Sequence, residues 1–112
     1  MASKELIAAS TKPLVLAMLS RGESYGYAII DEVRERSGGQ LEWSEGMLYP
    51  VLHRMEKEKL ILSCWKVGEN GRKRKYYRLS ASGTRAIATE RTQWLAVHET
   101  LASFWGVETC LT

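Results

Sequence analysis

The sequence predicts a single, mainly helical domain that carries one small β-hairpin. Its length of 112 residues is typical of one domain. Apolar residues recur with helical spacing along most of the chain. The turn dipeptide Asn70-Gly71 separates two short β-like runs. Hydrophobic residues make up 45% and charged residues 26%, so the chain is expected to bury a core rather than stay disordered.

Residues 4–20 are expected to form the first helix, with Leu14 and Met18 on its apolar stripe. Pro13 lies within this range, and a proline in a helix interior costs about 3 kcal/mol. We therefore expect either a kink at Pro13 or a second helix that starts near Thr11.

The next helix is expected over residues 25–37, with Ser24 as its N-cap. Ile29 and Val33 give it an apolar face. Gly38-Gly39 follows the last periodic residue and predicts the end of this helix.

A third helix is expected from Ser44, a candidate N-cap, to residue 59, after a stub of strand at residues 40–43. Pro50 is expected in or near its first turn, where the missing N–H is tolerated. Leu48, Leu52 and Met55 are expected to form one face of it.

Residues 60–67 and 75–79 are predicted to be the two strands of the hairpin, joined by a turn at 68–71. Alternation within the second strand places Tyr77 and Leu79 toward the core and Arg78 toward solvent. Ser80 is a candidate N-cap for a last helix that runs to about residue 105.

This order of elements predicts a winged helix-turn-helix, in which the third helix enters the major groove and the hairpin is the wing beside it. We assign residues 1–80 to this DNA-binding domain and residues 81–112 to a C-terminal dimerisation helix.

The charge is distributed unevenly along the chain, although the net charge is only +3. Residues 51–80 hold nine basic and three acidic side chains, whereas residues 1–50 hold five and seven and residues 81–112 hold two and three. Such a basic block is the pattern expected of a polyanion-binding surface. The alternative is a solvated face with chance clustering.

Several function classes are disfavoured. The sequence has no Ser/His/Asp or HExxH pattern, and no Cys or His lies at ligand spacing from Cys64 or Cys110, so we expect neither an enzyme nor a cofactor nor a metal site. The longest apolar run, residues 13–19, is too short to span a bilayer, and the N-terminus lacks the apolar stretch of a signal peptide. The expected location is the cytoplasm.

The wing carries a run of four basic residues, Arg72-Lys73-Arg74-Lys75. Successive side chains of a strand point to opposite faces, so this run can straddle a phosphate ridge or place an arginine in a minor groove. An ordinary solvated hairpin with charged edges is the alternative. Arg54 and Lys57 on the preceding helix favour nucleic acid.

Three motifs in this order resemble the PadR family of bacterial transcriptional regulators. They are residues 25–29 (YGYAI), residues 46–56 (GMLYPVLHRME) and residues 72–80 (RKRKYYRLS), followed by Gly83. The resemblance covers residues 6–84. It implies a homodimer of winged helix-turn-helix domains that binds double-stranded operator DNA, usually as a repressor, with a C-terminal helix as the dimer contact. The short C-terminal region resembles the short branch of the family.

The resemblance and the chemistry of the residues together define the expected DNA contacts. Met47 stands where the family often has Thr or Ser, which predicts an apolar contact to a thymine methyl. Tyr25 is either a phosphate contact or a core residue with one wet edge, and Tyr27 is expected in the core. The candidate DNA-binding residues are Tyr25, Ser44, Glu45, Gly46, Met47, Tyr49, His53, Arg54, Lys57, Arg72, Lys73, Arg74 and Lys75.

The last helix carries two parallel heptad repeats, which give it a broad apolar face. A monomer of this size cannot bury both that face and the winged domain's core, so we expect a partner helix. The candidate dimerisation residues are Ile87, Trp94, Leu95, Leu101 and Trp105.

Trp94 and His98 are also candidate effector-binding residues. Short members of the family that bind planar drugs carry a Trp at a similar position, so the resemblance implies a planar aromatic effector stacked between two copies of Trp94. The alternative is that Trp94 only packs in the interface.

A second class of function is a winged-helix interaction module that recruits a protein and binds no operator.

Overall fold

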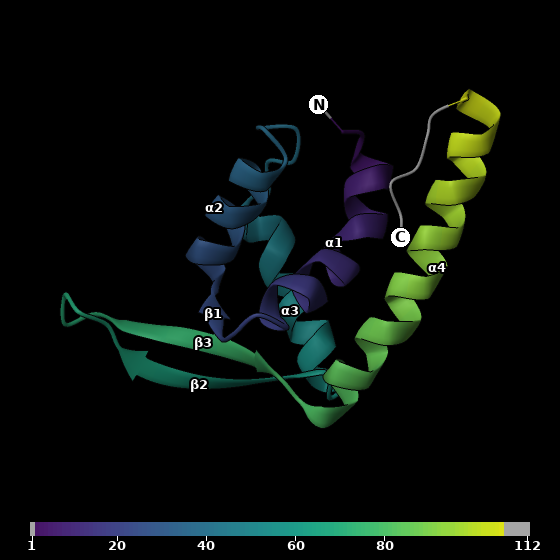
Figure 1. Cartoon of the computed structure of the whole chain (residues 1–112). Helices are drawn as coiled ribbons and strands as arrows, with labels where there is room; N and C mark the ends of the chain where they lie inside the picture. The colour runs from purple at the N-terminus through teal and green to yellow at the C-terminus, as the bar shows by residue number, and fades with distance from the viewer. Residues whose placement is uncertain (1, 107–112) are drawn as a thin grey trace.

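The computed structural model describes residues 2–106, which form three helices, a β-hairpin and a long final helix (Figure 1). The hairpin projects to one side of the molecule, and the final helix runs along the other. The predicted fold class, mainly helical with a small hairpin, is confirmed. The elements are α1 (Lys4–Leu19), β1 (Ser24–Tyr25), α2 (Gly26–Arg36), α3 (Glu45–Lys57), β2 (Ile61–Val67), β3 (Lys73–Leu79) and α4 (Ala81–Trp105).

Helix α1 is continuous across Pro13, so the alternative of a second helix near Thr11 is wrong. Its ribbon changes direction about midway (Figure 1), in agreement with the expected kink. The hydroxyl of the buried Thr11 donates to the Ile7 carbonyl at 2.6 Å, which satisfies a polar group inside the core.

Ser24 does not cap the second helix. Ser24 and Tyr25 are extended and form the two-residue strand β1, which pairs with β3 through Ser24–Tyr77 and Tyr25–Tyr76. Tyr25 takes the N-cap position of α2 and makes no side-chain capping bond. The predicted strand stub at residues 40–43 is also wrong, because that segment is irregular and the third strand comes from β1.

Helix α3 begins as predicted, with the Ser44 hydroxyl accepting a hydrogen bond from the Met47 N–H at 3.2 Å. Its buried face is the predicted one. Pro50, however, is the sixth residue of the helix rather than part of the first turn. Its missing N–H leaves the Gly46 carbonyl without a helical partner, but both residues are exposed, so water can serve that carbonyl.

The three strands form an antiparallel sheet in the order β1-β3-β2. In the hairpin Ile61 pairs with Leu79 and Val67 with Lys73. Ile61 and Tyr77 are buried at the base of the hairpin, whereas its tip extends past the core into solvent. Tyr77 and Leu79 therefore face the core and Arg78 faces solvent, as predicted.

The core lies between α1, α2, α3 and the base of the sheet. It includes Leu16, Ile29, Leu48, Leu52, Met55, Ile61 and Tyr77. Helix α4 packs along α1, and its C-terminal half extends beyond that contact (Figure 1). Within residues 2–106, none of the helices is both long and apolar enough to cross a membrane.

Gly83 permits the close approach of α4 to the sheet, because a Cβ at this position would lie 2.0 Å from the Leu60 carbonyl oxygen. We expect Gly83→Ala to lower the free energy of unfolding by about 3 kcal/mol. Gly46→Ala is the matched control, since its Cβ would meet only the Ser44 hydroxyl oxygen, at 4.0 Å. Because alanine is favoured over glycine at an exposed helical position, Gly46→Ala should raise the free energy of unfolding by at most about 1 kcal/mol. Urea denaturation measures both, and equal stability of the two variants would contradict the close packing.

Burial raises the pKa of Tyr77 to about 12, with the charge of Glu56 acting in the same direction. The unfolded chain has the ordinary tyrosine pKa of about 10, so its phenol ionises first as pH rises. The contribution of Tyr77 to stability is therefore complete below pH 10 and is lost progressively toward pH 12. Tyr77→Phe should show a shallower loss of unfolding free energy above about pH 10 than the wild type. Equal steepness in denaturant titrations would show that Tyr77 does not titrate differently in the folded state.

Candidate nucleic-acid interface

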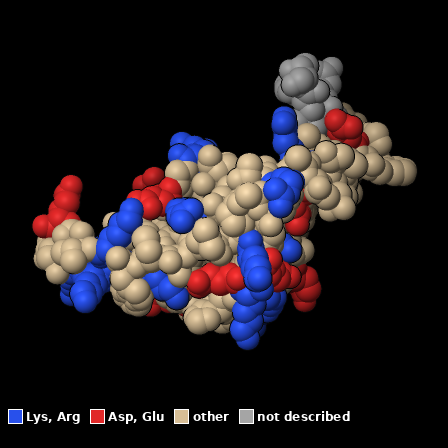
Figure 2. All heavy atoms as spheres, turned by 90° about the horizontal axis from the view of Figure 1, so that it is seen from below, with Lys and Arg blue, Asp and Glu red and all other residues tan. Residues whose placement is uncertain are grey.

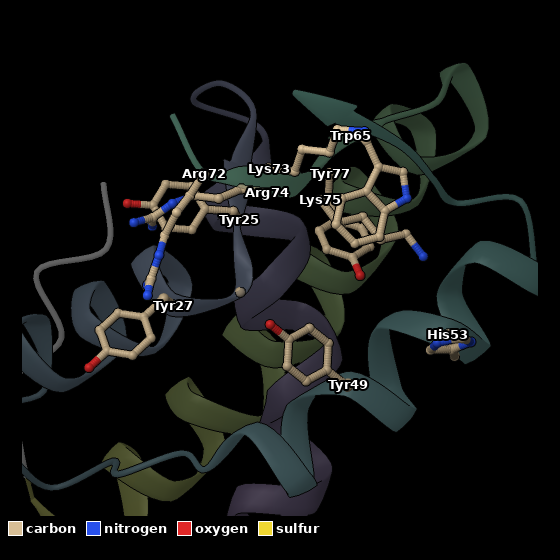
Figure 3. A pocket seen from close by; sticks show the side chains of 11 residues that line it. Tyr25, Tyr27, Tyr49, His53, Trp65, Arg72, Lys73, Arg74, Lys75 and Tyr77 are labelled. Carbon is tan, nitrogen blue, oxygen red and sulfur yellow. The ribbon is translucent and has the colours of Figure 1, made fainter. Parts of the chain in front are cut away.

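A cavity of about 660 Å³ lies between α2, α3 and the wing, which consists of β2, β3 and the turn between them. In Figure 3, Tyr25, Arg72 and Arg74 lie at one end of it, Trp65, Lys75 and Tyr77 lie at the other, and Tyr49 rises from α3 between them. The cavity therefore combines aromatic and basic side chains. Its lining residues are Tyr25, Gly26, Tyr27, Tyr49, His53, Trp65, Arg72, Lys73, Arg74, Lys75 and Tyr77.

Helix α3 presents an exposed stripe beside this cavity. Gly46, Pro50, His53 and Lys57 recur every three or four residues and are all exposed, because Leu48, Leu52 and Met55 hold the opposite face in the core. Arg54 is exposed on the flank of the stripe, and Ser44 and Glu45 are exposed at the start of the helix. Most of the candidate DNA-binding residues of α3 thus share one surface.

Met47 lies differently from the expectation. Its side chain is half-buried against the core, and its sulfur lies 3.7 Å from the Thr11 hydroxyl oxygen. An inward-facing side chain is poorly placed to meet a thymine methyl, so the structure lends no support to that contact.

The four basic residues of the wing fall into two groups. Arg72 and Lys73 are exposed and form no ion pair with any residue between 2 and 106. Lys75 is instead turned back toward α3, where its ammonium group lies 3.4 Å from the carboxylate of Glu56. Ser63 donates to the same carboxylate at 2.7 Å. In Figure 2 basic side chains gather along the projecting hairpin, while both signs of charge are interspersed over the rest of that face.

Arg74 lies over an aromatic ring. Its guanidinium carbon is 4.4 Å from the centre of the Tyr25 ring, and Tyr25 meets Tyr76 edge to face with centroids 5.2 Å apart. Tyr25 is half-buried in this cluster, which agrees with the interpretation of it as a packed residue with one edge in water.

Two further aromatic residues on this surface were missed by sequence reasoning. Tyr27 is 61% exposed, so the expectation that it lies in the core is wrong. Trp65 is 66% exposed and pairs with Lys75 across the hairpin. Strand alternation could have found Trp65, because it follows Ile61 and Ser63 on the face that leaves the core toward the tip.

Tyr49 is held in the cavity by a glycine. A Cβ on Gly26 would lie 2.6 Å from the Tyr49 hydroxyl oxygen, so only glycine allows the start of α2 to approach this phenol. Sequence reasoning named Tyr49 but not Gly26.

A second cavity, of about 520 Å³, lies between α1 and α4. It is lined by apolar residues of α1 and by Ile87 and Trp94 of α4. The charged residues Glu90 and Arg91 of α4 also line it. The candidate effector pair is not brought together there, since His98 is exposed and is not among the lining residues. Within the described part of the chain, no three His, Cys, Asp or Glu side chains gather to hold a metal ion.

The candidate dimerisation residues divide along α4. Ile87, Trp94 and Leu95 are half-buried within this chain, whereas Leu101 and Trp105 are exposed. Val97 and Phe104, which sequence reasoning did not name, are exposed in the same C-terminal half, Phe104 by 85%.

Comparison with known proteins places this surface in a family. A family model described as the transcriptional regulator PadR-like family matches residues 15–89. A PadR-like transcriptional regulator from Bacillus cereus is 30% identical, with a TM-score of 0.81 over 94% of this chain and 100% of that one. A transcriptional regulator from Clostridium thermocellum is 26% identical, with a TM-score of 0.81 over 93% and 98% of the two chains. An uncharacterised protein of Lysinibacillus sphaericus is 28% identical over 104 residues, which is 93% of this chain and 95% of that protein.

The matched residues include all of α2, α3 and the wing, so the family model covers the whole basic and aromatic surface. Members of this family are transcriptional regulators, which confirms the expectation that the chain is not an enzyme. The chain belongs to the PadR-like family of transcriptional regulators.

Proposed function

We propose that this protein binds double-stranded operator DNA as a homodimer and represses transcription. The observation that carries the proposal is a set of four exposed cations on two neighbouring elements. Arg72 and Lys73 of the wing line the cavity, and Arg54 and Lys57 lie on α3, whose residues Tyr49 and His53 line it too. Basic side chains that are free of acidic partners are available to neutralise DNA phosphates.

The two elements would read DNA in different ways. An α-helix fits the major groove, so the exposed stripe of α3 meets base edges, and Gly46 lets the backbone at its start approach closely. The wing meets the neighbouring phosphates or the minor groove through Arg72 and Lys73. Base preference then depends on α3, and affinity for any sequence depends on the cations.

The C-terminal half of α4 supports the homodimer. Val97, Leu101, Phe104 and Trp105 recur at helical spacing, and Trp105 is 70% exposed. A contiguous apolar stripe of this kind is a common mark of an interface. A second copy of the same helix would cover it and would pair two α3 helices for a two-fold symmetric operator.

The cavity between α1 and α4 supports a planar aromatic effector. Trp94 provides a flat ring on which such an effector can stack. Pro13, Leu14 and Ile87 line the cavity with apolar surface, and Glu90 lines it as well. A ligand that binds one arrangement of α1 and α4 better than another would shift the separation of the two α3 helices in the dimer. Packing of Trp94 alone is the competing explanation.

The salt dependence of DNA binding tests the proposal. Four cations per protomer make about eight phosphate contacts per dimer, so log K should fall against log salt with a slope of about −7. Replacing both Arg72 and Lys73 with Gln should reduce the slope to about −3 to −4, because four contacts are lost per dimer. The measurement is fluorescence anisotropy with a duplex that the wild-type protein selects from a randomised library.

Arg85→Gln on α4 is the control, because Arg85 is exposed and outside the cavity and should leave the slope unchanged. A wild-type slope near −2 would instead favour the alternative, a winged-helix module that recruits a protein partner. Elution of the free protein as a monomer would contradict the dimer.

The effector is tested by fluorescence titration with a panel of planar aromatic drugs. The protein has four tryptophans, so the wild type is compared with Trp94→Phe. We expect saturable quenching in the wild type and its loss in Trp94→Phe, because the ring that stacks with the drug is gone. Quenching that is absent, or that persists unchanged in the variant, would leave Trp94 as a packing residue.

A further inference from the structure

Toward its tip, the wing leaves the core a short way from Tyr77. Little backbone pairing holds this outer part of the wing to the helices. Strand β1 contributes only Ser24 and Tyr25, so beyond Tyr76 the hairpin has no third strand beside it. A two-stranded ribbon without a third strand is a weak structure by itself. Side-chain contacts must therefore set the angle of the wing.

The outer face of the sheet carries one group of such contacts. The strand register places Tyr25 beside Tyr76, and places Lys66 opposite Arg74 one pleat nearer the tip. Arg74 reaches back over the Tyr25 ring at 4.4 Å. The Lys66 ammonium lies 5.4 Å from the centre of the Tyr76 ring and forms an ion pair with Glu23, the residue before β1.

The inner face carries a second group. Glu56 of α3 accepts a hydrogen bond from Ser63 of β2 at 2.7 Å and pairs with Lys75 of β3 at 3.4 Å. One carboxylate thus joins both strands of the wing to the helix expected to enter the major groove.

We propose that Arg74 and Lys66 are positioning residues, which hold the wing at a set angle to α2 and α3, and that within the basic run 72–75 only Arg72 and Lys73 bind phosphate. The DNA-binding consequence rests on the proposed function above, whereas the bracing is a property of the free protein. Each contact is weak at a protein surface, so removing one loosens the wing without unfolding the domain.

The first measurement uses the protein without DNA. Arg74→Gln should raise amide hydrogen-exchange rates in β1 and β3 by about three-fold or more, because the guanidinium no longer holds Tyr25. Arg72→Gln is the matched control, since it removes the same charge two residues away on the turn side and should leave these rates unchanged. Equal rates in wild type and Arg74→Gln would overturn the bracing.

The second measurement repeats the salt titration with the library-selected duplex. Arg72→Gln should make the slope shallower by about 2, since one phosphate contact is lost in each protomer. Arg74→Gln should weaken binding several-fold at every salt concentration with the wild-type slope, because it removes no phosphate contact. A slope that falls in Arg74→Gln as in Arg72→Gln would show that Arg74 meets phosphate and would overturn the assignment.

Tyr25 variants separate stacking from a hydroxyl contact. Tyr25→Phe keeps the ring under Arg74 and should leave the exchange rates of β1 and β3 in the free protein as they are in the wild type; faster exchange would show that the hydroxyl, rather than the ring, holds the wing. Tyr25→Leu should reproduce the loss seen in Arg74→Gln, and the double variant should be no weaker than either single one, since both remove the same contact. Additive losses would contradict coupling. If the wild type selects no duplex, the proposed function fails, and the exchange rates still decide the bracing.

Discussion

The burial of Tyr77 is the constraint on which the arrangement of the wing depends. Tyr77 lies in the central strand and pairs with Ser24 on one side and Ser63 on the other. Because side chains alternate along a strand, a slip of one residue would move Tyr77 out of the core and turn every basic side chain of the wing to the opposite face. One buried ring at the base thus determines which cations face α3 and which face outward.

That register divides the basic block of residues 51–80 by the partners of its side chains. The number of basic residues suggests many phosphate contacts, but Lys66 and Lys75 have acidic partners and Arg74 lies over a ring. A charge that is already paired, or stacked against the protein, is less available to release counterions from DNA. The number of cations available to DNA is therefore smaller than the sequence count, and these cations include Arg54 and Lys57 on α3 and Arg72 and Lys73 near the tip of the wing.

Helix α4 shows a similar division along its length. Its first half lies against α1, where Ile87 and Trp94 line a cavity, and its second half carries Leu101 and Trp105 into solvent. The heptad pattern in the sequence is the same in both halves. What differs is the neighbour, because α1 covers only part of the helix (Figure 1).

Local chemistry determined much of this protein from the sequence by itself. The Ser44 and Ser80 caps, the turn before Arg72 and the buried face of α3 follow from residue type and spacing, and the structure agrees with each. Motif order was enough to indicate the family. These features depend on interactions within a few residues, which a sequence displays directly.

Only the tertiary structure decided the exposure and the contacts of Tyr25, Tyr27, Met47 and Trp65. Ser24-Tyr25 reads locally as the start of a helix, yet it is a strand because β3, some fifty residues later, offers an unpaired edge. Tyr27 lies in solvent at the start of α2, and Met47 packs inward, with its sulfur near the Thr11 hydroxyl of α1. Whether a side chain is exposed, and which residues it contacts, depends on the distant segments of the chain that pack against it. No local sequence pattern contains that information.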